Sequence, residues 1–281
     1  MGAPVTLVDS GGTPLSIASN NSLFTSDVHM RGMDFYTAVG LNMLSPSARR
    51  VTALGNNPDV DVGSVPEDVW SGGGLYPFMT GATSLEIVSD SASDTAAGVG
   101  ARTVLITGLD VNYVEQTDLM TLNGTTAVAV PKQYFRINQL IIITAGSTET
   151  NVGTITVRNA GAGTTRGLIP AGIGISRQAV FTVPAGHTLT IHSLFASLNR
   201  TSGIDKNVTI GFSFRTSLGV RRLTLEFSIS SVAPYRHDGI PGIVMAEKTD
   251  FSMRTTFTAS SDVDVTAAFL GVLIANTALT G

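Results

Sequence analysis

The clearest pattern in the chain is the alternation of apolar and polar residues in its last third. Three runs alternate in this way, at Val208–Arg215, Arg222–Ile229 and Phe251–Thr258. Successive side chains of a β-strand point to opposite faces. Each run therefore predicts a strand with one buried and one wetted face, as in an antiparallel sandwich. Ala267–Ala275 is apolar throughout, apart from one glycine, and predicts a strand covered on both faces.

The middle of the chain alternates short β segments with turns rich in Gly, Asn, Ser and Asp. The predicted strands are Ser84–Val88, Arg102–Leu109, Val114–Leu122, Tyr134–Thr144 and Gly153–Arg158. Asn123-Gly124 predicts a hairpin between Met120–Leu122 and Thr125–Val130, because both turn residues tolerate a positive φ.

These strands and turns predict an all-β chain. We expect two consecutive antiparallel β-sandwich or jelly-roll-like domains, at residues 80–168 and 174–276. The glycine-rich segment 161–172 is the expected linker between them.

Residues 1–79 have a different character. They are irregular and hold five of the eight methionines. One short helix is predicted, starting at Ser26 or Asp27 as N-cap, with apolar residues at three- and four-residue steps up to Met43. Pro46 ends it. We interpret 1–79 as an N-terminal anchoring or adaptor arm that orders against neighbouring subunits.

Aromatic residues gather at the end of this arm. Trp70, Tyr76 and Phe78 flank a run of glycines at 72–74. Aromatic side chains dominate the energetics of protein interfaces, so these three residues form a candidate assembly anchor. Two other interpretations stay open, a local mini-core between the arm and the first β domain, and a stacking platform for sugars.

The composition adds an indication of self-association. Only 14% of the residues are charged, against roughly 25% in average soluble domains. A monomer needs charged surface to stay apart from its neighbours, so we expect a homo-oligomer. The net charge of −4 gives no basic excess for nucleic acid. The longest apolar run, Ala267–Ala275, falls far short of the roughly 20 residues of a membrane span. Neither nucleic acid nor membrane is an expected partner.

No pattern of catalytic, cofactor-binding or metal-binding residues stands out. The chain lacks cysteine, which excludes thiolate sites. His187 and His192 have an odd spacing, so on one strand they would face opposite sides and could not chelate together. Asp59 and Asp61 resemble the start of a calcium loop, but the position that needs glutamate holds Trp70. We therefore expect a protein that is not an enzyme.

Several turn- and strand-forming stretches resemble structural proteins of tailed bacteriophages, especially marine, podovirus-like ones. The stretches are Gly55–Gly63, Glu67–Trp70, Gly72–Phe78, Ser93–Val104, Leu109–Tyr113, Thr121–Thr126 and Asn151–Ile155. The resemblance implies a virion structural protein that is assembled in the cytoplasm of the host bacterium. It supplies no catalytic residues.

Four functions follow as hypotheses. The leading one is a tail or collar appendage, a short fibre or fibre adaptor, built as a symmetric homo-oligomer with a trimer favoured. The second is a capsid decoration (cement) or head-fibre protein. The third, of another class, is a carbohydrate- or receptor-binding module for a host surface glycan. The fourth is an enzyme that degrades polysaccharide. Expected partners are the chain itself and other tail or capsid proteins.

Overall fold

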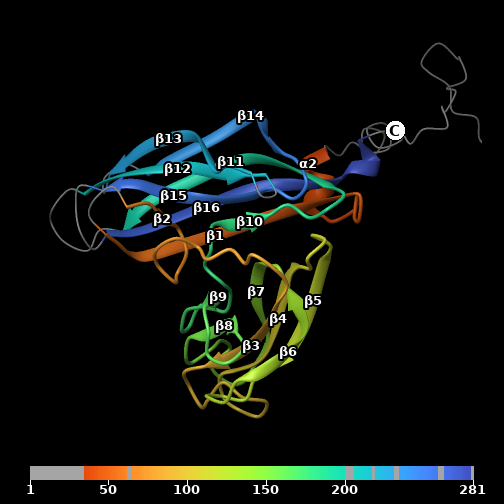
Figure 1. The fold of residues 1–281 in the computed structure, drawn as a ribbon, viewed down its shortest axis with the longest axis vertical. Helices are drawn as coiled ribbons and strands as arrows, with labels where there is room; N and C mark the ends of the chain where they lie inside the picture. The colour runs from red at the N-terminus through yellow and green to blue at the C-terminus, as the bar shows by residue number, and fades with distance from the viewer. Residues whose placement is uncertain are drawn as a thin grey trace, which may run out of the picture.

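A computed structural model describes residues 35–61, 65–199, 206–216, 219–230, 234–258 and 263–279, with side chains left out at 239–241. Antiparallel β-strands make up nearly all of its regular secondary structure. The described part also contains one short α-helix, α2 (Phe35–Gly40), and a final 3-10 turn, η1 (Asn276–Ala278). The predicted all-β class is confirmed. Figure 1 shows a larger domain with a smaller one beneath it.

The larger domain consists of two sheets. The first has the order β1-β16-β11-β14, with strands β1 (Ala48–Val60), β16 (Val263–Ala275), β11 (His187–Asn199) and β14 (Tyr235–Met245). The second has the order β10-β15-β12-β13, with strands β10 (Val180–Thr182), β15 (Asp250–Thr258), β12 (Asn207–Arg215) and β13 (Arg222–Ser230). The short β2 (Glu67–Asp68) adds to β15. Counted along the chain without β2, the eight strands lie in the orders 1-8-3-6 and 2-7-4-5.

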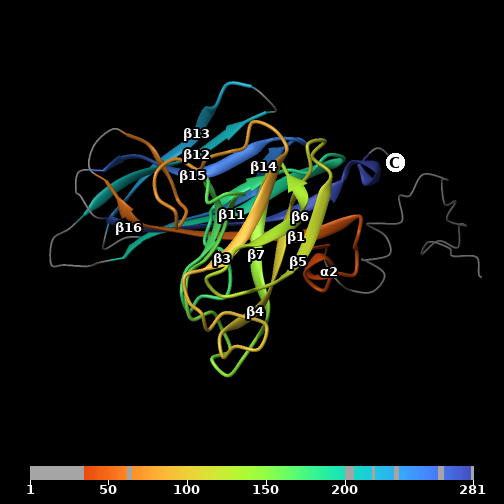
Figure 2. The ribbon, with the colours of Figure 1, turned by 60° about the horizontal axis from the view of Figure 1, so that its bottom comes forward.

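The smaller domain is inserted between β2 and β10, and we call it the inserted domain. One of its sheets has the order β6-β3-β8-β9, with strands β6 (Val128–Tyr134), β3 (Thr83–Ser89), β8 (Ile155–Asn159) and β9 (Thr165–Ile169). The other has the order β5-β4-β7, with strands β5 (Glu115–Thr121), β4 (Ala101–Leu109) and β7 (Arg136–Ala145). Figure 2 shows its strands running away from the larger domain.

Each domain has its own apolar core. Both sheets of the larger domain contribute to one cluster, in which the rings of Phe212 and Phe251 stack at 5.2 Å between centroids and Phe269 meets Phe251 at 4.7 Å. A separate cluster fills the inserted domain, where Leu85 and Ile106 have no exposed surface. Burial of each such side chain contributes about 1.5–3 kcal/mol, so each domain has its own source of stability.

The prediction of a separate N-terminal arm over residues 1–79 is wrong for β1 and β2, which belong to the larger domain. Ala48–Val60 is a full strand of the larger domain, paired with β16, and Val51 and Ala53 lie in its core. The sequence hides this strand because other inward positions carry residues such as Gly55 and Asn57 rather than an apolar series. The predicted consecutive domains at 80–168 and 174–276 are therefore one insertion within one larger domain. The predicted helix starts outside the described residues, and α2 overlaps its second half.

The predicted hairpin at Asn123-Gly124 is wrong. Gly124 has the expected positive φ of 59°, but β5 pairs with β4 and β6 pairs with β3, so the turn joins two different sheets. The expected linker is also corrected. Gly161 and Ala162, with φ values of 81° and 59°, form the turn between β8 and β9.

The alternation in β15 holds only in part. Phe251 and Met253 are fully buried as predicted, whereas Phe257 is 52% exposed. A register shift explains the difference, because Thr209 pairs with Phe257 while Ile210 pairs with Thr255. This irregularity turns Phe257 to the outer face of the sheet.

Candidate functional site at the domain junction

The aromatic cluster predicted as an anchor lies where the chain crosses into the inserted domain. Trp70 and Tyr76 are 4% and 5% exposed, and their rings meet edge to face at 5.1 Å between centroids. Phe78 packs on Tyr76 in the same way at 4.9 Å. Val180 completes the cluster. Trp70 and Tyr76 therefore bury their rings within their own chain, which corrects the anchor interpretation and agrees with the mini-core alternative.

The glycine run explains why these rings fold back on their own chain. Gly73 and Gly74 both have positive φ, 69° and 61°, which reverses the chain. A Cβ at Gly72 would lie 2.2 Å from the Trp70 ring, so only glycine fits there. The Trp70 indole Nε1 donates to the Gly74 carbonyl at 3.2 Å. The loop thus provides a close pocket for the indole.

Tyr76 connects the two domains. Its hydroxyl donates to the Arg166 carbonyl of β9 at 2.6 Å, and its backbone N–H donates to Asp68 Oδ2 of β2 at 2.8 Å. Burial raises the pKa of the Tyr76 hydroxyl well above its usual value, although the charges of Arg136 and Arg166 act in the opposite direction. The hydroxyl is therefore neutral and acts as a donor.

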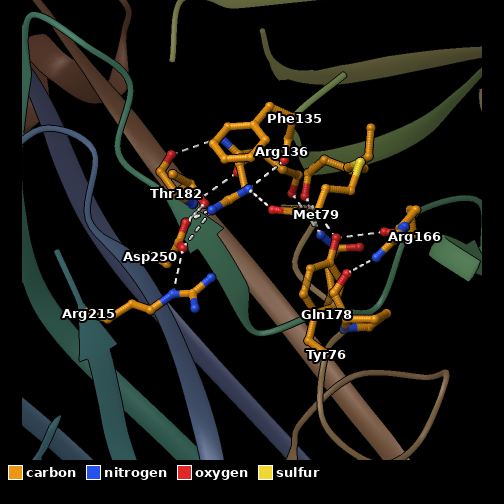
Figure 3. Close-up of polar contacts among 12 residues, drawn as sticks. Tyr76, Met79, Phe135, Arg136, Arg166, Gln178, Thr182, Arg215 and Asp250 are labelled. Carbon is orange, nitrogen blue, oxygen red and sulfur yellow. Dashed lines mark hydrogen bonds and ion pairs between the residues drawn. The ribbon is translucent and has the colours of Figure 1, made fainter. Parts of the chain in front are cut away.

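The central contact of the junction is an ion pair between Arg136 of β7 and Asp250 of β15 (Figure 3). Arg136 Nε donates to Asp250 Oδ1 at 2.7 Å and Nη2 donates to Oδ2 at 2.9 Å. The two side chains are only 4% and 2% exposed. The third guanidinium nitrogen, Nη1, donates to the carbonyls of Met79 (2.8 Å) and Phe135 (2.7 Å). The pair is bidentate and buried, the geometry that arginine and carboxylate favour.

Asp250 has further donors on its own side of the junction. Thr182 Oγ1 donates to Oδ1 at 2.7 Å, and Arg215 Nε donates to Oδ2 at 3.0 Å. Burial alone would raise the pKa of the Asp250 carboxyl, but Arg136, Thr182 and Arg215 together hold that pKa below its usual value. The carboxylate is therefore ionised at neutral pH.

A second buried ion pair lies beside the first. Asp68 of β2 is fully buried and accepts two bonds from Arg254, at 2.7 and 2.9 Å. Ser252 Oγ adds a third bond at 2.6 Å. This pair fixes the segment that leads into the aromatic cluster onto β15.

Arginines outnumber the acids around Phe78. The guanidinium carbons of Arg136, Arg215 and Arg221 lie 5.3, 5.0 and 5.3 Å from the centre of its ring. Burial, together with the nearby charge of Arg254, lowers the pKa of Arg221 to about 10. The ring face provides a favourable electrostatic surface for these cations.

Side-chain amides join the domains by hydrogen bonds to backbone groups across the junction. Asn138 Nδ2 donates to the Thr182 carbonyl at 3.0 Å, and the Thr182 N–H returns a bond to Asn138 Oδ1 at 2.9 Å. Gln178 Nε2 donates to the Ile137 carbonyl at 3.0 Å. At the outer end of the junction, Arg49 of β1 pairs with Glu115 of β5. These contacts hold the inserted domain in one orientation.

Asp59 and Asp61, which resemble the start of a calcium loop, line a cleft of about 570 Å³. Glu67 lines the same cleft. The Glu67 carboxylate accepts bonds from the N–H groups of Asp61 (2.9 Å) and Gly74 (3.0 Å), so it organises the loop. Among the described residues, no group of three or more His, Asp or Glu side chains is placed to hold a metal ion.

The histidine prediction concerns β11. His187 has the same parity as the core residue Leu189, while His192 has the opposite parity and meets the Tyr36 ring at 5.0 Å on the outer face. The prediction from their spacing assumed a strand without a bulge, whereas β11 has a register shift between Ile191 and Ser193, at His192 itself. In the part of the chain that the structure covers, no helix is both long and apolar enough to cross a membrane.

Comparisons with known proteins give little. No family model and no curated protein matches the sequence. Among solved structures, one of infectious bursal disease virus, Gx strain, shares 11% identity over 86% of this chain and 78% of that chain, with a TM-score of 0.23. The PBSX exported protein XepA shares 9% identity over 96% and 99%, with a TM-score of 0.19.

Proposed function

We propose that this chain is a structural subunit of a bacteriophage virion, with a jelly-roll larger domain from which the inserted domain projects. The strand order carries the proposal. Its eight strands form the neighbouring pairs 1-8, 2-7, 3-6 and 4-5, divided between two sheets. That order is the one obtained by rolling up a single long hairpin into a jelly roll, an architecture of viral capsid and lectin domains and of cupins.

The junction supports a mechanical role. Its most deeply buried acids, Asp68 and Asp250, each accept at least three bonds from side chains, and the aromatic cluster packs beside them. A buried charge network of this kind specifies one geometry at the expense of desolvation. A subunit repeated by symmetry needs such a fixed geometry, because every copy must present the same surfaces.

Within this class we propose a tail or collar appendage, a short fibre or its adaptor. A capsid decoration or head-fibre protein is the alternative. The anchoring role predicted for residues 1–79 now applies only to the residues before β1, because β1 and β2 are parts of the larger domain. Self-association and contact with other virion proteins belong to the same proposal.

Labelling of purified phage particles tests this function. Antibodies against the inserted domain should bind intact particles and mark either the tail or the capsid in electron micrographs. Tail labelling supports the appendage and capsid labelling supports the decoration protein. Absence of the chain from purified infectious particles, measured by mass spectrometry, would overturn the proposal.

A further inference from the structure

Strand β16 is apolar on both faces, yet only part of it is covered by this chain. Its inward residues, such as Phe269 and Leu273, lie in the core. On its outward face, Val272 and Ile274 pack beneath α2. Leu270, on the same face, is 41% exposed. The two-sided covering that the sequence predicts for this strand is therefore complete at one end and missing at the other.

The uncovered part belongs to a continuous apolar patch on the sheet β1-β16-β11-β14. Leu54 of β1 and Phe195 of β11 are the two neighbours of Ala268 on β16, and they are 38% and 36% exposed. Directly opposed side chains in a sheet lie about 4.5–5.5 Å apart, so these residues touch or nearly touch. Val244 of β14, although 68% exposed, pairs with Thr190 and lies apart from this patch. We call Leu54, Phe195, Ala268 and Leu270 the apolar face.

Charge borders this face directly on one side, where the exposed ion pair Arg236–Asp238 of β14 lies opposite Phe195 and Ser193. The nine central outward positions of β1, β16 and β11 are all uncharged: Thr52, Leu54, Asn56, Ser193, Phe195, Ser197, Thr266, Ala268 and Leu270. Cores of protein interfaces are depleted in charge in the same way, with polar rims. A solvated sheet of a monomer would carry lysine or glutamate at such positions.

We infer that the apolar face binds the same face of a second copy of this chain. Two charged residues at its ends favour this partner. Arg50 is opposite Val272, four residues from Ala268 in one direction, and Asp264 lies four residues away in the other. A two-fold axis across the strands at Ala268 places Arg50 of each copy near Asp264 of the other. The oxygens of Asp264 are bound within the chain by the neutral amides of Asn56 and Asn199, which leaves its charge to attract a cation.

The uncovered sheet alone is smaller than the interface of a stable dimer. Three strands spaced about 4.8 Å apart cover roughly 330 Å² over Asp264–Leu270, the stretch of β16 that α2 leaves open, at about 3.3 Å per residue. Stable interfaces bury about 800 Å² per partner. The exposed side chain of Tyr36 on α2 meets His192 of β11 and supplies further area, and Leu41 and Met43 just after α2 are exposed as well. The choice of a second copy as partner rests on the proposed assembly function.

Sedimentation of the full-length chain tests the surface. Wild type should sediment as a dimer or larger species, and Leu270→Glu should weaken association at least about tenfold, because it places a carboxylate at an interface centre. The matched control is Leu119→Glu on β5 of the inserted domain, where Leu119 is 60% exposed; it should leave association unchanged. Circular dichroism and thermal melts check that each variant is folded. A monomeric wild type, or a Leu270→Glu variant that associates as wild type does, overturns the inference.

Charge exchange tests the two-fold arrangement. Arg50→Glu and Asp264→Arg should each weaken association, and the double variant should recover it. Failure of the double variant to recover would contradict the arrangement.

A second test uses the absence of cysteine. The sheets of two copies should lie about 10 Å apart, so Ala268→Cys should be joined to itself by a short bismaleimide. Leu119→Cys should not be joined.

The failure of this inference and that of the proposed function are distinguishable. A monomeric chain that is still found in purified particles overturns the apolar face as a self-contact and leaves the virion role standing. A chain that forms the predicted dimer but is absent from particles overturns the virion role alone.

Discussion

The domain junction buries charged side chains, whereas the apolar face exposes apolar ones. At the junction, Arg136, Asp68 and Asp250 are buried charges, and each is bound by several groups of the same chain. On the apolar face, Leu270 and Phe195 are uncharged, yet remain over a third exposed. The junction is complete within one chain, whereas the face is complete only with a partner. The comparison separates contacts that hold the subunit together from contacts that would join subunits.

Removal of residues 1–79 should have the largest effect, because it damages both regions. It deletes β1, which carries Leu54, and β2, which carries Asp68. We expect an aggregated or unfolded product, measured by circular dichroism and limited proteolysis. Deletion of residues 1–34 alone is the control and should leave the β fold intact. A soluble, cooperatively folded product of the longer deletion would contradict the role given to β1.

Arg136→Met should be the most damaging single change at the junction. It leaves the Asp250 carboxylate buried with fewer partners, and loss of one member of a buried ion pair costs about 3–5 kcal/mol. Denaturant unfolding measures the change in the free energy of unfolding. The control is Arg236→Met, which breaks the exposed pair with Asp238 and should have a much smaller effect, because solvent screens exposed ion pairs. Equal effects of the two variants would remove the distinction between junction and surface.

Acid should loosen the junction before it affects the apolar face. Because the pKa of Asp250 is lower in the folded state than in the unfolded chain, its contribution to stability is present above the unfolded value and is lost as pH falls through the folded value, below about pH 4. Thermal unfolding between pH 5 and pH 2 measures this loss. Asp250→Asn should be less stable throughout and should show a smaller decline. An identical decline in both proteins would assign the acid sensitivity elsewhere.

Tyr76→Phe should have a moderate effect. It removes the donor to the Arg166 carbonyl and leaves a part-buried acceptor without that bond, which costs about 1 kcal/mol. The aromatic packing on Trp70 and Phe78 is retained, so the effect reports the bond between domains. Denaturant unfolding gives its size, and a loss of less than about 0.5 kcal/mol would show that the bond is not needed.

Leu270→Ser should have the smallest effect on the isolated subunit. The side chain is 41% exposed and lies outside the core, so we expect the free energy of unfolding at low protein concentration to change by about 0.5 kcal/mol or less. The same variant should associate more weakly at high concentration. A large loss of stability at low concentration would mean that this chain already covers Leu270.

Parts of this structure could be predicted from the sequence because they follow local rules. The apolar positions of the alternating runs in β12 and β15 predict core residues such as Val208, Phe212 and Phe251, although polar neighbours such as Ser213 and Ser252 are buried as well. β1 escapes the same reasoning because Gly55 and Asn57 occupy inward positions. The insertion could not be predicted, because a local turn such as the one at Gly124 permits a change of chain direction but does not specify which strand pairs with which.

The junction could be predicted only in part. Trp70, Tyr76 and Phe78 stand out by residue type and by the glycines between them, and the mini-core they form was among the expected outcomes. Arg136 and Asp250 are 114 residues apart, and no local pattern connects them. Each of the two residues begins a strand next to a phenylalanine. A charged side chain beside a buried ring needs a partner of opposite charge, and this is the one sequence feature that indicates the pair.

Electron cryomicroscopy of the purified phage particle tests the central claim most directly. We expect subunits repeated by symmetry, each with the inserted domain projecting in one fixed orientation and with the apolar face covered by the same face of a second copy. Particles that lack the subunit, or subunits whose apolar face points to solvent, would contradict the account.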